Sequence, residues 1–136
     1  MGRDTAAGAL WGVVVILLPR AVRVYVATQP VSLRRSFDGL SNEVRGVLQR
    51  DPLSGHVFVF LNRRKNQVKL LVWTRGGFTI IHKRLERGRF AFAQQVTSEA
   101  TNVELDAHEL GMLLEGIDVT RARASSRWNP PAHTRA

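Results

Sequence analysis

The chain has 136 residues, of which 44% are hydrophobic, and this length suits a single domain with short tails. It contains no cysteine, which excludes disulfide bonds, thiolate metal sites, iron–sulfur clusters and cysteine nucleophiles. Twenty basic residues against eleven acidic ones give a formal net charge of +9 at pH 7, and this excess indicates a polyanionic partner, most simply nucleic acid.

The first distinctive segment is the apolar run Leu10–Leu18. It is too short to span a bilayer as a helix, which needs about 20 residues. A signal peptide would need a basic start and a cleavage site of small residues, whereas Arg3 is offset by Asp4 and Pro19 follows the run. We therefore expect residues 1–19 to form an N-terminal extension of a cytoplasmic protein that has no membrane contact.

A strand and then a long helix are predicted for the next part of the chain. Val22–Ala27 alternates valine with polar or aromatic residues, which is typical of a half-buried strand. After a break at Pro30, the hydroxyl of Ser32 is positioned to cap a helix. Apolar residues then recur at spacings of three and four, which predicts one amphipathic helix of about 18 residues that ends near Arg50. Its apolar stripe consists of Leu33, Phe37, Leu40, Val44, Val47 and Leu48.

The middle of the chain predicts three strands joined by short turns. They are Val57–Leu61, Gln67–Thr74 and Phe78–Leu85, and polar turns at residues 62–66 and Arg75-Gly76-Gly77 connect them. Connections this short make the three strands antiparallel neighbours, because parallel strands need a long crossover. The first strand is continuously apolar, which favours a central place in the sheet.

A second, shorter helix is predicted near the end of the chain. Asp106 can cap it, and Glu109 stands three residues later, in the position that completes a capping box. The helix is expected to cover Ala107–Glu115, with three leucines on one face, and Gly116 is expected to end it. Before it, Val103–Leu105 is a candidate extended segment.

These elements predict an α+β fold, in which a small antiparallel sheet of about four strands packs against one long helix, with a second short C-terminal helix. We expect a single domain over residues 20–120, between the extension at 1–19 and a tail at 121–136. The tail carries four arginines, no acid and the pair Pro130-Pro131, a composition that favours disorder.

The positive charge is concentrated in the body of the predicted domain. Residues 20–89 carry fifteen basic and four acidic side chains, whereas residues 90–120 carry six acids and no Lys or Arg. If the three central strands pair, the turn after the first strand and the end of the third lie at the same end of the sheet. We therefore predict one basic patch that binds nucleic-acid phosphates. Its members are Arg34, Arg35, Arg63, Arg64, Lys65, Lys69, Lys83, Arg84, Arg87 and Arg89.

Aromatic side chains lie among these basic residues in the sequence, namely Trp73, Phe78 and Phe90. Such interleaving can bind bases by stacking as well as phosphates by charge. The alternative is that these aromatic residues belong to the core, and that the arginines form an ordinary solvated surface.

No constellation of residues supports catalysis. Two-metal phosphoryl transfer needs carboxylates that converge on ions roughly 4 Å apart, but the basic body holds only four scattered acids. The four histidines show no metal-ligand spacing, and no phosphate-binding glycine loop is present. We therefore expect a protein that is not an enzyme and has no cofactor or metal site. A nuclease that uses Asp38 or Glu86 is the remaining enzymatic alternative.

Five blocks of sequence carry a resemblance to a known family. They are Ser32–Leu40 (SLRRSFDGL), Asp51–Phe60 (DPLSGHVFVF), Asn62–Trp73 (NRRKNQVKLLVW), Gly76–Phe90 (GGFTIIHKRLERGRF) and Leu113–Asp118 (LLEGID). In this order they resemble the TnpB-type accessory proteins of the insertion sequence sixty-six family, which are distinct from the RNA-guided nuclease of the same name. The resemblance covers about residues 22–118.

The resemblance implies an accessory role in the transposition of a bacterial insertion sequence, beside a separate DDE transposase that cuts and joins the DNA. It carries no catalytic residue over to this chain. We therefore expect a non-catalytic protein that binds DNA, the transposase or both through the basic patch. The alternative is a protein–protein interaction module that binds the transposase without contacting nucleic acid. In that case the acidic segment at residues 90–120 makes the contact, and the positive charge serves solubility.

Overall fold

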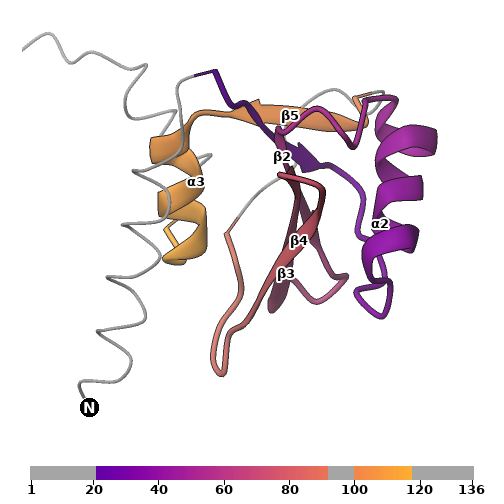
Figure 1. The fold of residues 1–136 in the computed structure, drawn as a ribbon. Coiled ribbons are helices and arrows are strands. Elements are labelled where there is room, and N and C mark those ends of the chain that lie inside the picture. Colours follow the sequence, from indigo (N-terminus) through magenta and orange to yellow (C-terminus); the bar gives the residue numbers. More distant parts are fainter. Residues whose placement is uncertain (1–20, 92–99, 118–136) are drawn as a thin grey trace, which may run out of the picture.

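A five-stranded sheet lies between two helices in the computed structural model of the protein (Figure 1). The structure describes residues 21–91 and 100–117. The strands of the sheet are β1 (Val24–Ala27), β2 (Val57–Leu61), β3 (Gln67–Thr74), β4 (Gly77–Arg84) and β5 (Asn102–Leu105). Their order across the sheet is β4-β3-β2-β1-β5. One face is covered by helix α2 (Phe37–Glu43) and its continuation, the π-helical turn η1 (Val44–Leu48), and the other face by helix α3 (Ala107–Leu114).

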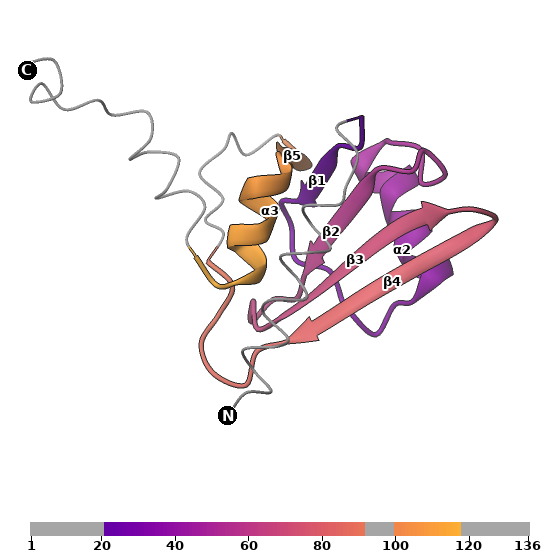
Figure 2. The same ribbon diagram turned by 60° about the vertical axis from the view of Figure 1, so that its left-hand side comes forward.

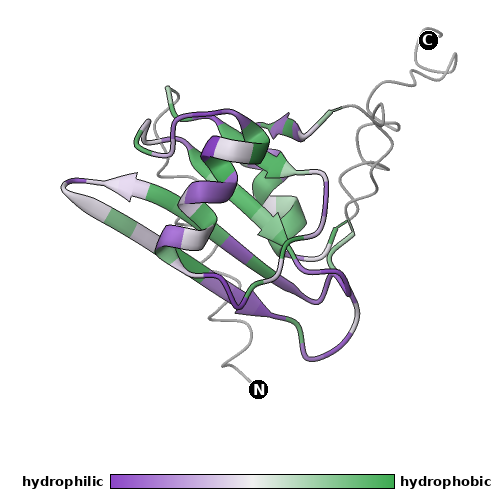
Figure 3. Ribbon diagram, turned by 90° about the vertical axis from the view of Figure 1, so that its right-hand side faces the viewer, coloured by the Kyte–Doolittle hydropathy of each residue, from purple (hydrophilic) through white to green (hydrophobic). Residues whose placement is uncertain are grey.

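The centre of the sheet is buried on both faces because each face is covered by a helix. All five residues of β2 are buried, and this strand is central, as its continuous apolar run predicts. Its side chains alternate between two hydrophobic clusters. Val57 and Val59 pack on the side of α3, whereas Phe58 and Phe60 pack on the side of α2. Figure 3 shows the hydrophobic strands that result at the centre of the sheet.

The strand pairing confirms part of the predicted sheet and corrects the rest. β2, β3 and β4 are antiparallel neighbours, as their short connections predict. β1 and β2 run parallel, however, because α2 carries the chain back across one face of the sheet between them. β5 pairs antiparallel with β1 and adds a fifth strand of only four residues. The prediction of an antiparallel sheet of about four strands is therefore wrong in strand number and in the pairing of β1 with β2.

The prediction of one long helix that begins at Ser32 is also wrong. The helical segment consists of the 7 residues of α2 and the 5 residues of η1, and its N-cap is Ser36. The chain before it stays beside β2, because the buried Val31 donates its backbone N–H to the Leu61 carbonyl over 3.0 Å. The Ser32 hydroxyl then accepts the backbone N–H of Arg34 over 3.4 Å, so that it forms a local turn in place of a helix cap.

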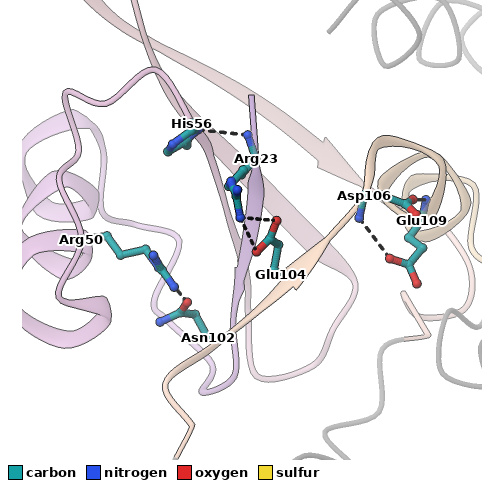
Figure 4. A network of polar contacts seen from close by, with 7 residues as sticks. All are labelled: Arg23, Arg50, His56, Asn102, Glu104, Asp106 and Glu109. Carbon is teal, nitrogen blue, oxygen red and sulfur yellow. Dashed lines mark hydrogen bonds and ion pairs between the residues drawn. The ribbon is translucent and has the colours of Figure 1, made fainter. Parts of the chain in front are cut away.

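The end of the helical segment is tied to the edge of the sheet formed by β1 and β5. The segment stops where Gln49 adopts a left-handed conformation with φ 56°. The guanidinium of Arg50 lies 3.7 Å from the centre of the Tyr25 ring, and its Nε donates to Asn102 Oδ1 over 2.9 Å (Figure 4). Arg50 therefore joins η1 to β1 and β5.

Helix α3 forms as predicted, with its capping box. The Glu109 N–H donates to the Asp106 carboxylate over 2.7 Å, and the Asp106 N–H donates to the Glu109 carboxylate over 3.0 Å (Figure 4). Gly116, with φ 86°, follows the C-terminal end. There the Lys83 ammonium, from β4, donates to the Leu114 carbonyl over 2.7 Å. This bond satisfies a carbonyl in the last turn, where no helical partner is available.

Several predictions concern segments outside the residues that the structure describes. The N-terminal extension at 1–19 and the basic tail at 121–136 both lie there. The division into one domain and two tails therefore stays a prediction. Within residues 21–91 and 100–117, no helix is long and apolar enough to cross a membrane.

Candidate nucleic-acid interface

One end of the sheet gathers most of the predicted basic residues. The turn after β2 lies there, and the register places Gln67, at the start of β3, opposite Arg84, at the end of β4. The loop after β4 then returns to this turn, because the backbone N–H of Phe90 donates to the Lys65 carbonyl over 2.6 Å. The turn after β2 and the loop after β4 therefore lie side by side, at the end of β4 that the arrowhead marks in Figure 2.

Six exposed arginines lie on the segments that meet at this end, which are the loop before α2, the turn after β2 and the last residue of β4 with its following loop. We name this surface the cationic end. It consists of Arg34, Arg63, Arg64, Arg84, Arg87 and Arg89. Arg84 pairs with the exposed Glu86 over 3.1 Å, a contact that solvent weakens. The other five have no ion-pair partner among the carboxylates that the structure describes.

A groove opens between the loop before α2 and the turn after β2. Its volume is about 560 Å³, and the arginines of the cationic end that line it are Arg34, Arg63 and Arg64. The other lining residues are Pro30, Val31, Ser32, Leu33, Asn62, Asn66 and Gln67. Each guanidinium can donate two parallel hydrogen bonds to a phosphate. Three of them around one groove therefore form a candidate site for a phosphate backbone.

A smaller hollow of about 300 Å³ adjoins the groove at Gln67. It is lined by Gln67, His82, Arg84 and Glu86. His82 Nε2 lies 2.8 Å from Gln67 Oε1, at hydrogen-bond distance. Partial burial lowers the pKa of His82, and the positive charges of Lys69 and Arg84 lower it further. At neutral pH, His82 is therefore a neutral hydrogen-bonding group beside the arginines.

Three of the predicted site residues make contacts that hold the fold together. Lys69 is only 9% exposed, and its ammonium donates to the Arg35 carbonyl over 2.8 Å. The Arg35 side chain in turn pairs with Glu43 of α2. Lys83 binds the end of α3, on the opposite face of the sheet. Lys65 lies in the turn after β2 but is half-buried. We therefore place these four residues outside the cationic end.

Replacing Lys69 with Met is expected to lower the free energy of unfolding by about 1–3 kcal/mol, because the Arg35 carbonyl would lose a partly buried hydrogen bond. Affinity for a DNA oligonucleotide is expected to change by less than about threefold. Urea unfolding and fluorescence anisotropy measure the two quantities. A variant that stays as stable as the original protein but binds much more weakly would place Lys69 in the binding surface instead.

The aromatic residues do not lie among the arginines of the cationic end. Trp73 and Phe78 pair edge to face, with ring centres 4.9 Å apart, beside the turn between β3 and β4 at the other end of the sheet. Phe90 is 1% exposed and belongs to the core. Stacking of bases on these three rings is therefore not available beside the groove.

Near β1 and β5, charged residues neutralise one another. Arg23 pairs with Glu104 over 3.4 Å, and its backbone N–H donates to His56 Nδ1 over 3.0 Å (Figure 4). Asp106 and Glu109 are engaged in the capping box. The described part of the acidic segment thus offers fewer free carboxylates than its composition indicates. Among the same described residues, no group of three or more His, Asp or Glu could hold a metal ion.

The sequence does not point to Asn66 and Gln67 as members of the groove, although both line it. The available signal is the pair of asparagines at the ends of a polar turn, because an Asn side chain organises the backbone that follows it. Asn62 Oδ1 accepts the backbone N–H groups of Asn66 and Gln67, each over 3.0 Å. This pattern fixes the turn that carries Arg63 and Arg64.

Comparison with known proteins identifies the family. A family model described as IS66 Orf2 like protein matches residues 22–124, which is most of the chain. The chain belongs to this family. It is similar to two proteins of Sinorhizobium fredii (strain NBRC 101917 / NGR234). "Uncharacterized protein y4jC" is 36% identical over 104 residues, which cover 76% of this chain and 86% of that protein. "Uncharacterized protein y4hO" is 34% identical over 110 residues, which cover 80% of this chain and 90% of that protein.

Membership of the IS66 Orf2-like family confirms the resemblance found in the sequence and indicates an accessory role associated with transposition. The matched residues, 22–124, include all six arginines of the cationic end and both helices that cover the sheet. No solved structure matches the chain. The cationic end therefore lies in the part of this chain that defines its family membership.

Proposed function

We propose that this IS66 Orf2-like protein is a non-catalytic accessory factor of transposition that binds DNA through its cationic end. The observation that carries the proposal is the meeting of six exposed arginines at one end of the sheet, three of them around a groove. Arginine suits phosphate because it stays charged and donates two hydrogen bonds in a fixed geometry. Family membership supplies the link to transposition.

Contacts between arginine and phosphate position a protein on DNA without reading the base sequence. The protein would thus hold DNA of the mobile element, or would help to hold the transposase on it. A separate DDE transposase would cut and join the strands.

The direct test is the salt dependence of DNA binding. Four phosphate contacts predict a slope of about −3.6 for log affinity against log salt, so that affinity falls roughly 100-fold between about 50 and 200 mM salt. Fluorescence anisotropy with a labelled oligonucleotide measures the affinity at each salt concentration. No binding at the lower concentration, or an affinity that does not depend on salt, would contradict the proposal.

Protonation of His82 is expected to strengthen this binding as the pH falls. A phosphate beside His82 favours the imidazolium, so the pKa of His82 is higher in the complex than its lowered value in the free protein. Binding therefore takes up a proton between the two pKa values, and affinity rises as the pH falls through that range. The gain is up to about tenfold for each unit by which phosphate raises the pKa.

Anisotropy between about pH 7.5 and 5.5 measures this dependence, in the range around and below the ordinary His pKa of about 6.5. His82→Gln keeps a side chain that can hydrogen-bond but removes the titrating group, so its affinity is expected to be nearly independent of pH. A His82→Gln variant with the same pH profile as the original protein would show that the proton is taken up elsewhere.

A second candidate function is a protein-interaction module that binds the transposase. It is favoured by exposed apolar side chains on the helical segment and the loop after it, where Phe37, Val47 and Leu53 are 45%, 41% and 45% exposed. Large apolar side chains exposed along one segment are candidates for contacts with a protein partner. A pull-down with purified transposase after nuclease treatment separates the two candidates. A complex that survives the nuclease favours the module, whereas a complex that is lost favours DNA binding.

A further inference from the structure

The groove of the cationic end has two chemically different sides. The turn after β2 contributes the guanidinium groups of Arg63 and Arg64, whereas the loop before α2 contributes the apolar side chains of Pro30 and Leu33 together with Arg34. Leu33 is held in place because it packs against the hydrophobic cluster under α2. Phosphate binding requires the arginines alone, so the apolar side indicates a ligand that also has an apolar part.

Unused hydrogen-bond donors line the same groove. The Asn66 side-chain carbonyl accepts from the Asn62 amide over 2.7 Å, and the Gln67 carbonyl is bonded to His82. The side-chain amide nitrogens of Asn66 and Gln67 have no hydrogen-bond acceptor among the residues that the structure describes. Both can therefore donate to a ligand. The edges of nucleic-acid bases present acceptors of this kind, as carbonyl oxygens and ring nitrogens.

An unpaired nucleotide has all three of the features that the groove can contact. Its phosphate is negative, its base has an apolar face, and its base edge has acceptors. In a duplex the base faces are stacked inside and cannot reach an apolar wall, whereas an unpaired base can be turned out and held between side chains. The groove volume of about 560 Å³ also lies within the range of about 300–1,000 Å³ that is usual for small-molecule sites.

We propose that the groove receives an unpaired nucleotide, so that the protein prefers single-stranded DNA to duplex DNA. This inference rests on the DNA binding proposed above. The expected ligand is DNA and not RNA, because the family is associated with transposition of a DNA element. Arg34, Arg63 and Arg64 hold the phosphates, Pro30 and Leu33 pack against the base, and Asn66 and Gln67 donate to its edge.

The test compares four labelled ligands of equal length at one salt concentration, using the full-length protein. They are a single-stranded DNA, the duplex made from it, the same strand with abasic sites, and the matching RNA. The single strand is expected to bind about tenfold more tightly than the duplex, as one packed base would provide. The abasic strand keeps the phosphates and is expected to lose this advantage. Equal or tighter binding of the duplex or of the abasic strand would overturn the inference, and tighter binding of the RNA than of the single-stranded DNA would overturn the assignment of the ligand to DNA.

Substitutions separate this inference from the proposed function. Leu33→Ser is expected to weaken binding of the single strand severalfold and to leave duplex binding unchanged, because all the arginines of the groove remain; Leu33 also packs against the cluster under α2, so the fold of this variant is checked by urea unfolding. Pro30→Ser is a second variant at an exposed position, with less risk to the fold. Arg63→Ala is expected to weaken binding of both the single strand and the duplex. If all ligands bind with equal affinity and Arg63→Ala lowers the affinity for each of them, the proposed DNA binding stands and the preference for a single strand fails. If no ligand binds, both fail.

Discussion

Replacing Arg63 and Arg64 together with alanine is expected to lower the affinity for DNA by about 30-fold, because each lost contact with a phosphate costs roughly 1 kcal/mol. Both side chains are exposed, line the groove and have no carboxylate partner among the described residues. The salt dependence is expected to weaken as well, with a slope smaller by about 1.5–2 for the two contacts. Anisotropy titrations at several salt concentrations provide both values.

The matched control removes two positive charges at positions away from the groove. Arg45 lies on η1 and Arg75 in the turn between β3 and β4, at the other end of the sheet from the groove, and both are exposed. The double variant Arg45→Ala/Arg75→Ala has the same net charge as Arg63→Ala/Arg64→Ala. It is expected to keep its affinity within about threefold, because only a general, screened attraction is lost. Equal losses in the two variants would mean that net charge, and not the cationic end, causes the binding.

Replacing Phe60 with alanine is expected to lower the free energy of unfolding by about 3–5 kcal/mol, because it removes a large buried side chain and leaves a cavity. Phe60 is 0% exposed and lies on the central strand, in the cluster under α2. Its cross-strand neighbour is Lys69, whose ammonium holds the Arg35 carbonyl before α2. Total stabilities of domains are only about 5–15 kcal/mol, so this loss should be obvious in urea unfolding.

Phe37→Ala is the control for this variant. It removes the same ring from the first residue of α2, where Phe37 is 45% exposed, so the expected loss is below about 1 kcal/mol. Similar stabilities of the two variants would contradict the arrangement in which α2 and the sheet enclose a tightly packed layer.

Sequence patterns were sufficient to predict the elements whose structure depends on residues close together in the sequence. The turns between β2, β3 and β4 are too short for any but antiparallel pairing, so the sequence predicts these three strands correctly. The capping box of Asp106 and Glu109 is another local pattern, and it forms as predicted. The same strand order also predicts that the turn after β2 and the end of β4 meet, which is how the arginines come together.

Contacts between distant segments could not be predicted from such patterns. The helix begins at Phe37 and not near Ser32, because Val31 bonds to β2 and keeps the chain beside the sheet. The parallel pairing of β1 with β2 depends on the path of α2, and β5 needs the exposed edge of β1. Likewise, the sequence places Lys69 and Lys83 within strands, but it does not show that each ammonium reaches a backbone carbonyl.

The most direct test of the central claim is a map of the residues that DNA contacts in solution. Backbone amide chemical shifts, recorded by NMR while a short DNA oligonucleotide is added, provide this map. If the cationic end binds DNA, the largest changes are expected in residues 32–35, 62–67 and 84–90. Largest changes in α3 and β5, or small changes spread over the whole domain, would contradict the claim that this end of the sheet is the DNA-binding surface.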